Sequence, residues 1–178
     1  MDSALIRPAS PADLPVITRI YAQAVLHGTA SFELEPPGEA EMTRRYANIT
    51  EKGMPYLVAE RSGAVVGYAY AGPFRERAAY RYTLEDSIYV APDAQRGGIG
   101  RALLARLITE SEARGFRQMI AVIGDSAQHG SIAVHRAAGF TDIGVMRASG
   151  FKFGRWLDVV LMQRALSDGD ASLPGSVR

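Results

Sequence analysis

Apolar residues near the N-terminus recur at the spacing of a helix. Ser10 and Pro11 stand before this stripe and Gly28 follows it, and these residue types favour a helix start and a helix stop. The spacing therefore predicts a helix from about Ser10 to about Leu26, with one buried face. The stripe consists of Leu14, Ile17, Ile20, Tyr21, Ala24 and Val25. A second helix is predicted over residues 39–49.

Short runs rich in β-branched and aromatic residues predict strands. Residues 56–60 and 65–71 flank Arg61-Ser62-Gly63, a turn signal that predicts an antiparallel hairpin. Residues 82–90 form the next predicted strand, which ends before Ala91-Pro92-Asp93.

The centre of the chain predicts a strand, a glycine-rich loop, a helix and another strand. The motif Gln95-Arg96-Gly97-Gly98-Ile99-Gly100 opens a helix that runs to Arg114, before Gly115. An apolar run over residues 119–123 predicts a buried strand directly after it. The loop therefore lies at the N-terminus of a helix.

The C-terminal part predicts a short helix and two strands. The helix covers about residues 131–138, and the strands lie near residues 140–147 and 156–163. Residues 167–178 are polar and contain Gly and Pro, so we expect a disordered tail. We expect residues 1–166 to form a single domain of mixed α/β class.

Composition excludes several classes of protein. The chain has 178 residues, 47% of them apolar and 22% charged, as in globular domains. Its apolar runs are too short to span a membrane, and Met1 to Leu5 lack a signal-peptide pattern, so we expect a cytoplasmic protein. A net charge of +1 gives no general attraction to nucleic acid or anionic membranes. The three histidines form no recognisable ligand set, and we predict no metal site.

The glycine-rich loop has the features of an anion site. Unpaired N–H groups at a helix start attract anions, and glycines allow an anion to approach the backbone closely. Arg96 and Arg101 would add positive charge. A purely structural turn is the alternative when the loop is considered alone. Neither the Gly-Lys-Ser/Thr of nucleotide-triphosphate loops nor the glycine spacing of dinucleotide-binding loops is present.

The same motif resembles the Gln/Arg-x-x-Gly-x-Gly/Ala loop of the GNAT superfamily of N-acetyltransferases, in which it holds the pyrophosphate of coenzyme A. The resemblance covers about residues 6–166. Residues 82–90, 121–124 and 150–158 resemble more closely the branch that acetylates phosphinothricin and methionine sulfoximine.

This resemblance implies the GNAT fold, a mixed and mostly antiparallel central sheet that is splayed at the cofactor site and flanked by helices. It also implies that the cofactor is acetyl-CoA. A homodimer is expected from the resemblance, with residues 152–156 near the partner subunit.

Acetyl transfer to an amine requires a neutral nitrogen, a polarised thioester carbonyl and a proton for the departing thiolate. Glu85 is the predicted general base on the strength of the resemblance, whereas an isolated strand glutamate more often forms a salt bridge or a solvated face. Strand alternation places Asp86 on the opposite face among apolar neighbours, which makes it a weaker candidate for the base.

In most of the superfamily a tyrosine donates the proton to the departing thiolate. The resemblance places His135 at that position, so His135 is the predicted general acid. A structural histidine bonded to backbone is the alternative.

Further cofactor contacts follow from the resemblance. The main chain of Ile88, Tyr89 and Val90 is expected to face the pantetheine arm and to supply oxyanion donors. Gln128 aligns with a position at which the branch usually has asparagine, which puts its contact in doubt, whereas Ser131 is retained. The predicted cofactor set is Ile88, Tyr89, Val90, Gln95, Arg96, Gly97, Gly98, Ile99, Gly100, Arg101, Gln128 and Ser131.

A small amino-acid-like acceptor would need cationic donors for its carboxylate. The candidates are Arg75, Arg81 and Lys152, although a solvated arginine is the plain alternative. The expected aromatic walls are Phe32, Phe74, Tyr89 and Phe153, with packing in the core as the alternative. We therefore predict acetylation of such an amino group. A different amine acceptor (polyamine, aminoglycoside or protein N-terminus) and a non-catalytic coenzyme A-binding module are the two rival functions.

Overall fold

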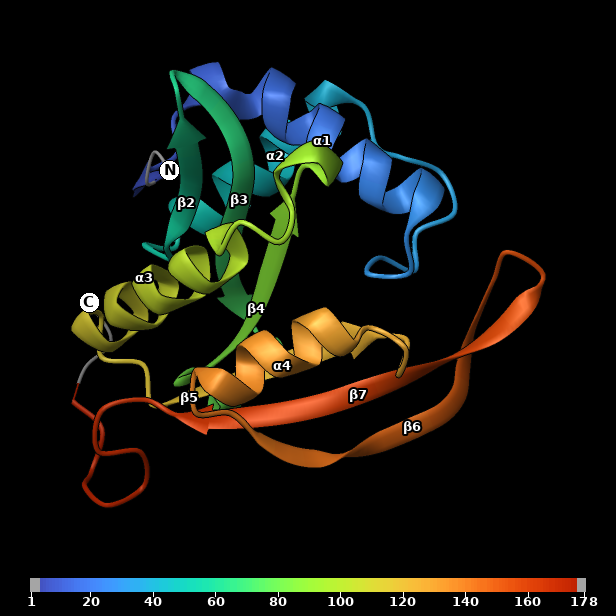
Figure 1. The fold of residues 1–178 in the computed structure, drawn as a ribbon. Helices are drawn as coiled ribbons and strands as arrows, with labels where there is room; N and C mark the ends of the chain where they lie inside the picture. The colour runs from blue at the N-terminus through green and yellow to red at the C-terminus, as the bar shows by residue number, and fades with distance from the viewer. Residues whose placement is uncertain (1–3, 176–178) are drawn as a thin grey trace.

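The computed structural model describes residues 4–175, which form one seven-stranded sheet in the order β1-β2-β3-β4-β5-β7-β6 (Figure 1). Neighbouring strands are antiparallel except β4 and β5, which are parallel. The strands are β1 (Leu5–Pro8), β2 (Tyr56–Arg61), β3 (Ala64–Pro73), β4 (Thr83–Val90), β5 (Gln118–Gly124), β6 (Thr141–Lys152) and β7 (Arg155–Ala165).

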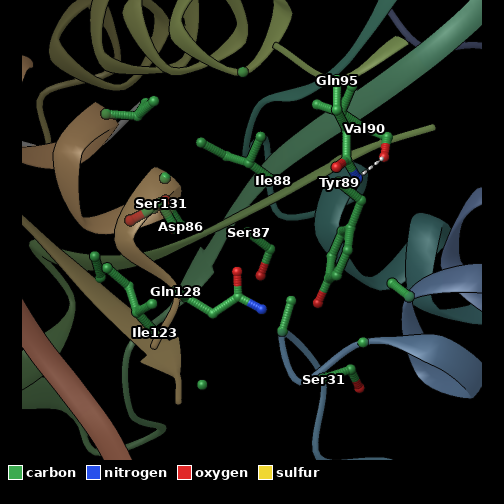
Figure 2. A pocket seen from close by; sticks show the side chains of 18 of the residues that line it. Ser31, Asp86, Ser87, Ile88, Tyr89, Val90, Gln95, Ile123, Gln128 and Ser131 are labelled. Atoms are coloured by element: carbon green, nitrogen blue, oxygen red, sulfur yellow. Dashed lines mark hydrogen bonds between the residues drawn. The ribbon is translucent and has the colours of Figure 1, made fainter. Parts of the chain in front are cut away.

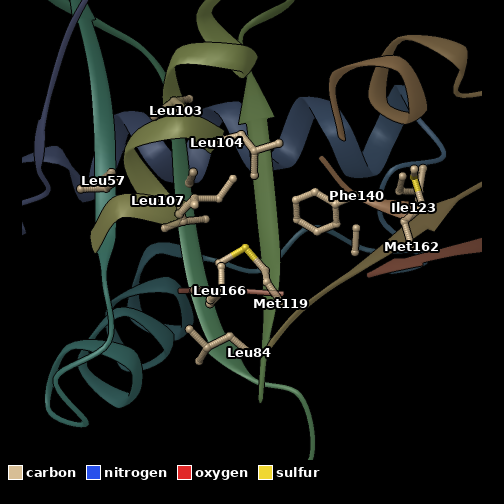
Figure 3. Packing of buried hydrophobic residues seen from close by; sticks show 14 of the residues in the cluster. Leu57, Leu84, Leu103, Leu104, Leu107, Met119, Ile123, Phe140, Met162 and Leu166 are labelled. Atoms are coloured by element: carbon tan, nitrogen blue, oxygen red, sulfur yellow. The ribbon is translucent and has the colours of Figure 1, made fainter. Parts of the chain in front are cut away.

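Helices cover both faces of this sheet. They are α1 (Leu14–His27), α2 (Glu39–Thr50), α3 (Ile99–Ala113) and α4 (His129–Ala137), and a 3-10 turn, Pro11–Asp13, precedes α1. Because side chains alternate along β2, Tyr56 and Val58 pack with α1 and α2, whereas Leu57 and Ala59 face α3. Figure 3 shows the second of these cores, with leucines of α3 lying over the sheet. The predicted α/β class with flanking helices is confirmed.

The sheet splits between its two parallel strands. β4 and β5 pair from Thr83 opposite Gln118 only as far as Asp86 opposite Ala121. Beyond that point β4 continues beside β3, and β5 continues beside β7. A space therefore opens between the carboxyl halves of β4 and β5, as the expected splayed sheet requires.

Two elements differ from the predictions. β1 was not predicted, because four residues are too few for alternation to be recognised. β6 extends to Lys152, five residues past its predicted end, and forms with β7 a long hairpin that leaves the body of the molecule (Figure 1). Its register is irregular between Met146 and Gly150, with φ of 49° at Ala148, and most of its side chains are exposed. Both features remove the alternation on which strand prediction depends.

The ends of the chain are only partly described. Residues 1–3 and 176–178 lie outside the described residues. The first group belongs to the N-terminus that is expected to lack a signal peptide, and the second belongs to the predicted tail. Residues 167–170 form a turn and residues 171–175 continue without helix or strand, and the Arg117 guanidinium donates to the Ser172 carbonyl at 2.7 Å. The domain boundary at residue 166 stays a prediction. Within residues 4–175, each helix is too short or too polar to cross a bilayer.

Candidate active site

A cleft of about 1140 Å³ occupies the space where β4 and β5 separate. Its walls come from the end of α1, the α1–α2 loop, β4, the start of α3, β5 and α4. Figure 2 shows side chains from these elements converging on the cleft, among them Ser87, Tyr89, Gln128 and Ser131. The sheet thus supplies the floor, and segments distant in sequence supply the walls.

The glycine-rich loop forms one end of the cleft. Gly98 caps α3 with φ of 78°, a left-handed conformation that favours glycine, and a Cβ there would point into open space. The first helical hydrogen bond of α3 is donated by Ala102, so the amides of the preceding helical residues remain available to an anion. Gln95 holds the loop to the end of β4 through a 3.3 Å hydrogen bond from Nε2 to the Val90 carbonyl.

The structure brings most of the predicted cofactor residues together. Those that line the cleft are Ile88, Tyr89, Val90, Gln95, Arg96, Gly98, Ile99, Gly100, Arg101, Gln128 and Ser131. Gly97 does not line the cleft; a Cβ there would lie 3.5 Å from the Ala94 carbonyl oxygen. From Ser87 onward, the edge of β4 that faces β5 has no strand partner. That edge can present backbone N–H groups to an extended ligand.

Glu85 lies on the floor of the cleft, opposite Gly72 on β3 and Ile120 on β5. Its side chain is partly buried, and this burial raises the pKa of the carboxyl group above its ordinary value of 4.5. The neighbouring negative charge of Asp86 raises it further. Such a carboxylate binds a proton more readily than a solvated one, which suits a general base.

Asp86 and His135 form a buried pair between β4 and α4. Nε2 of His135 lies 2.9 Å from Oδ2 of Asp86, and Nδ1 lies 2.8 Å from the Ser131 carbonyl oxygen. Since a carbonyl oxygen only accepts, Nδ1 carries a proton and donates it there. Burial alone would lower the pKa of His135, but the Asp86 carboxylate and the Ser131 carbonyl raise it overall. The ring of the predicted acid therefore has both nitrogens engaged within the protein.

The α1–α2 loop forms the opposite end of the cleft. Phe32, predicted as a pocket wall, lines it, and its ring covers Gly124 and Gly150. A Cβ at Gly124 would lie 2.9 Å from Cε1 of this ring. The contact therefore depends on glycine at both positions.

A polar network on this side was not predicted from the sequence. Tyr21 donates to Glu33 at 2.8 Å and shares a 2.9 Å hydrogen bond with the Ser31 hydroxyl, while Arg45 donates to Glu33 at 2.6 Å. Ser31, Glu33 and Tyr70 also line the cleft. No local pattern marks this network, because Tyr21, Glu33 and Arg45 lie on α1, the α1–α2 loop and α2, which only the fold brings together.

Several predicted substrate residues lie elsewhere. Arg75 lines a separate hollow of about 360 Å³ with Glu76, Arg77 and Tyr80. Its guanidinium carbon lies 5.1 Å from the ring centre of Phe74, which lies outside the lining of the large cleft. Arg81 does not line either space. Its guanidinium carbon lies 4.6 Å from the centre of the Tyr82 ring, and it donates to the Ala78 carbonyl at 3.2 Å.

The other two candidates lie at the end of the β6–β7 hairpin. Lys152 is buried, with its ammonium hydrogen-bonded to two carbonyls of the α1–α2 loop. Phe153 is 54% exposed and lies in neither space. No group of three or more metal-ligating side chains occurs within residues 4–175.

Comparison with known proteins agrees with this architecture. A phosphinothricin N-acetyltransferase of Alcaligenes faecalis is 54% identical over 169 residues, which cover 95% of this chain and 86% of that protein. An L-methionine sulfoximine/L-methionine sulfone acetyltransferase of Salmonella typhimurium is 42% identical over 163 residues, or 92% of this chain and 95% of that protein.

Solved structures and a family model give the same result. A GNAT superfamily phosphinothricin acetyltransferase from Sinorhizobium meliloti, solved in complex with AcCoA, is 54% identical and superposes with a TM-score of 0.95. The match covers 98% of this chain and 94% of that chain. The sequence model of the Acetyltransferase (GNAT) family matches residues 22–140. The chain therefore belongs to the GNAT family of acetyltransferases.

Proposed function

We propose that this protein transfers the acetyl group of acetyl-CoA to the amino group of a small amino-acid-like acceptor of the phosphinothricin or methionine sulfoximine type. One observation carries this proposal: the cleft joins a helix N-terminus suited to phosphates with a carboxylate, Glu85, whose pKa is raised by burial. The related acetyltransferases named above support the acceptor class.

The cleft fits coenzyme A along its length. The glycine loop and the start of α3, with Arg96 and Arg101, would hold the pyrophosphate. The unpaired edge of β4 at Ile88, Tyr89 and Val90 would bind the pantetheine arm, with Gln128 and Ser131 on the opposite wall. When bound, acetyl-CoA supplies a thioester whose carbonyl can be attacked by an amine.

Glu85 is the proposed general base, because it lines the cleft and its raised pKa favours proton uptake from the acceptor's ammonium or amine. The backbone N–H groups near Tyr89 and Val90 would stabilise negative charge on the thioester oxygen. For His135 we propose a positioning role in place of the predicted acid. Both of its ring nitrogens are engaged, so the imidazole fixes the separation of β4 and α4 on the two walls of the cleft.

The anionic end of the acceptor requires positive charge near Glu85. β3 ends at Pro73, next to Gly72 that pairs with Glu85, and the hollow containing Arg75 and Arg77 begins directly afterwards. We therefore propose that Arg75 and Arg77 bind the acceptor's carboxylate. Arg81 is not part of this proposal, since it lines neither the hollow nor the large cleft.

We further propose a homodimer in the cytoplasm that acts on small molecules rather than on nucleic acid or membranes. The end of the β6–β7 hairpin exposes Phe151, Phe153 and Trp156, with 57%, 54% and 65% of their surfaces accessible. Exposed aromatic residues gathered in this way favour burial against another protein surface. The net charge of +1 provides no general field for polyanions. Acetylation of phosphinothricin would give a host herbicide resistance.

An acceptor panel with thiol release as the readout tests the function. We expect methionine sulfoximine or phosphinothricin to be acetylated at least tenfold more efficiently than its carboxamide, because a charged hydrogen bond is worth about 1.5–3 kcal/mol. Preference for spermidine or an aminoglycoside over every amino acid would overturn the acceptor class. Binding of acetyl-CoA without transfer to any amine would instead support a binding module.

A further inference from the structure

Lys152 has an unusual environment for a lysine. It is one of two lysines in the chain, the other being Lys52, and only 4% of its surface is accessible. Its ammonium donates to the Ser31 carbonyl at 2.7 Å and to the Gly28 carbonyl at 3.0 Å. Within residues 4–175 it forms no ion pair with a carboxylate, and burial lowers its pKa. Two carbonyl groups therefore hold this buried ammonium directly, while the Phe153 ring, centred 5.0 Å from Nζ, and the negative charge of Glu33 attract it from further away.

These two carbonyls belong to the segment that walls the end of the cleft opposite the glycine loop. Residues 28–33, here called the wall loop, contribute Gly28, Ala30, Ser31, Phe32 and Glu33 to the lining. A single ammonium that binds the carbonyls of Gly28 and Ser31 fixes the curvature of the backbone between them. Lys152 itself lies outside the lining, so its effect on the cleft passes through this loop.

Other residues hydrogen-bond to side-chain hydroxyls of the wall loop, whereas Lys152 binds the carbonyls of Gly28 and Ser31. Gln128 donates to the Thr29 hydroxyl at 2.9 Å, and Tyr21 shares a hydrogen bond with the Ser31 hydroxyl. Loss of the ammonium would leave two carbonyl oxygens without their buried partner, which costs more than a solvated hydrogen bond. The loop could recover hydration only by moving outward, and Phe32 would then move with it.

We propose that Lys152 is a positioning residue for acceptor binding: its ammonium holds the wall loop and thereby places Phe32 over the acceptor end of the cleft. This proposal rests on the proposed function for the identity of the acceptor. The glycine loop, at the other end of the cleft, contacts neither Lys152 nor the wall loop through any hydrogen bond within residues 4–175. Through Gln128, which donates to Thr29, the wall loop touches the wall assigned to the pantetheine arm, but in the described part of the chain it has no such link to the glycine loop. We therefore expect Lys152 to affect the acceptor much more than the cofactor.

Kinetics of Lys152→Met test this role, because methionine keeps an unbranched stem that ends where the ammonium of lysine would begin, and it removes the donors. We expect KM for the amino-acid acceptor to rise about tenfold, while the Kd of acetyl-CoA stays within twofold. Lys52→Met is the matched control, since Lys52 is exposed in the turn after α2 and should leave both constants unchanged. An unchanged acceptor KM in a folded Lys152→Met protein, or an equal loss of acetyl-CoA affinity, would overturn the proposal.

A second pair of measurements, chemical labelling of the wild-type protein and hydrogen exchange in Lys152→Met, needs no turnover. An amine-reactive reagent followed by mass spectrometry compares the labelling rates of Lys152 and Lys52 in the wild-type protein. We expect Lys152 to react at least tenfold more slowly, and hydrogen exchange in Lys152→Met to increase at residues 28–33 specifically. Equal labelling of the two lysines, or unchanged exchange in the wall loop, would refute the proposal that Lys152 holds the wall loop. If no amino acid proved to be an acceptor, labelling and hydrogen exchange would still test whether Lys152 holds the wall loop, separately from the proposed function.

Discussion

Oδ2 of Asp86 lies 2.9 Å from Nε2 of His135, and both side chains are buried between β4 and α4. The other ring nitrogen donates to the Ser131 carbonyl, so the orientation of the imidazole is fixed from two sides. The second oxygen of Asp86 is buried without a hydrogen-bond partner in the described part of the chain. The carboxylate thus depends strongly on His135 for its stabilisation.

Asp86→Asn tests the contribution of this pair to stability. The pKa of His135 is raised above its ordinary value of 6.5, so the stabilisation is fully present below pH 6.5 and is lost as pH rises through the raised value. We expect the variant to lose about 1–3 kcal/mol of unfolding free energy near pH 6 and less at alkaline pH. Urea unfolding at several pH values measures this difference. A double-mutant cycle with His135→Gln isolates the pair, and a pH-independent coupling energy would contradict its ionic character.

Glu85→Gln tests the general base. Because the amide cannot accept the proton, kcat should fall on the order of a hundredfold, while the Kd of acetyl-CoA stays near the wild-type value. The raised pKa of Glu85 also places the acid limb of the wild-type kcat/KM profile above pH 4.5. The variant should lack that limb. Wild-type turnover by Glu85→Gln would remove this residue from the mechanism.

The anion site at α3 is tested with two matched substitutions at Gly98. Its φ of 78° makes any side chain unfavourable, but asparagine tolerates the left-handed region, and the adjoining space is open. Gly98→Asn therefore controls for shape, and Gly98→Asp adds a negative charge at the helix N-terminus. We expect the aspartate variant to bind acetyl-CoA about tenfold more weakly than the asparagine variant in calorimetry. Equal affinities would argue against an anion at this loop.

The arginines of the β3–β4 loop differ in their surroundings, and this difference leads to a prediction. Arg75→Ala and Arg77→Ala should reduce the preference for an amino acid over its carboxamide by about one to two decades in kcat/KM. Arg81→Ala should leave the preference intact, because Arg81 stacks on Tyr82 outside the hollow. A larger effect of Arg81→Ala than of the other two variants would reverse the assignment.

The proposed dimer is tested at the hairpin end. Trp156 is 65% exposed, and the centre of its ring lies 5.2 Å from the centre of the Phe151 ring. Trp156→Glu should leave the fold intact and convert a dimer into a monomer, as measured by sedimentation equilibrium. Leu5→Glu is the control, because Leu5 is 60% exposed on β1 at the opposite edge of the sheet. A monomeric wild-type protein would contradict the proposal directly.

Local patterns predicted much of the fold. The glycine loop, the start of α3 and the β2–β3 hairpin depend on residues close together in sequence, and the structure has all three. The splay between β4 and β5 was expected from family resemblance only. It arises where pairing stops at Asp86 and Ala121, and no local pattern marks the end of pairing between two strands that are separated in sequence by α3 and its loops.

The candidate site was less predictable where distant segments meet. The contact of Lys152 with Ser31 joins residues 121 positions apart, so its charge suggested a substrate contact rather than a buried anchor. Arg75 and Arg81 looked equivalent in sequence, yet Arg75 lines the hollow after β3, whereas Arg81 lies over Tyr82 outside it. Residue type indicates which chemistry a side chain can perform, but its use is decided by neighbours that only the folded chain brings together.

In the proposed acceptor site, the ring of Phe32 constrains the order in which substitutions could change the shape of the pocket. At Gly150, all of the nearest atoms that a new Cβ would meet belong to Phe32, so a smaller residue at position 32 must come first. At Gly124 the Thr29 backbone also blocks a side chain, and shrinking Phe32 would not release that position. A smaller residue at position 32, followed by a side chain at position 150, is therefore a sterically allowed order of substitution. A side chain at position 124 stays blocked whichever residue occupies position 32.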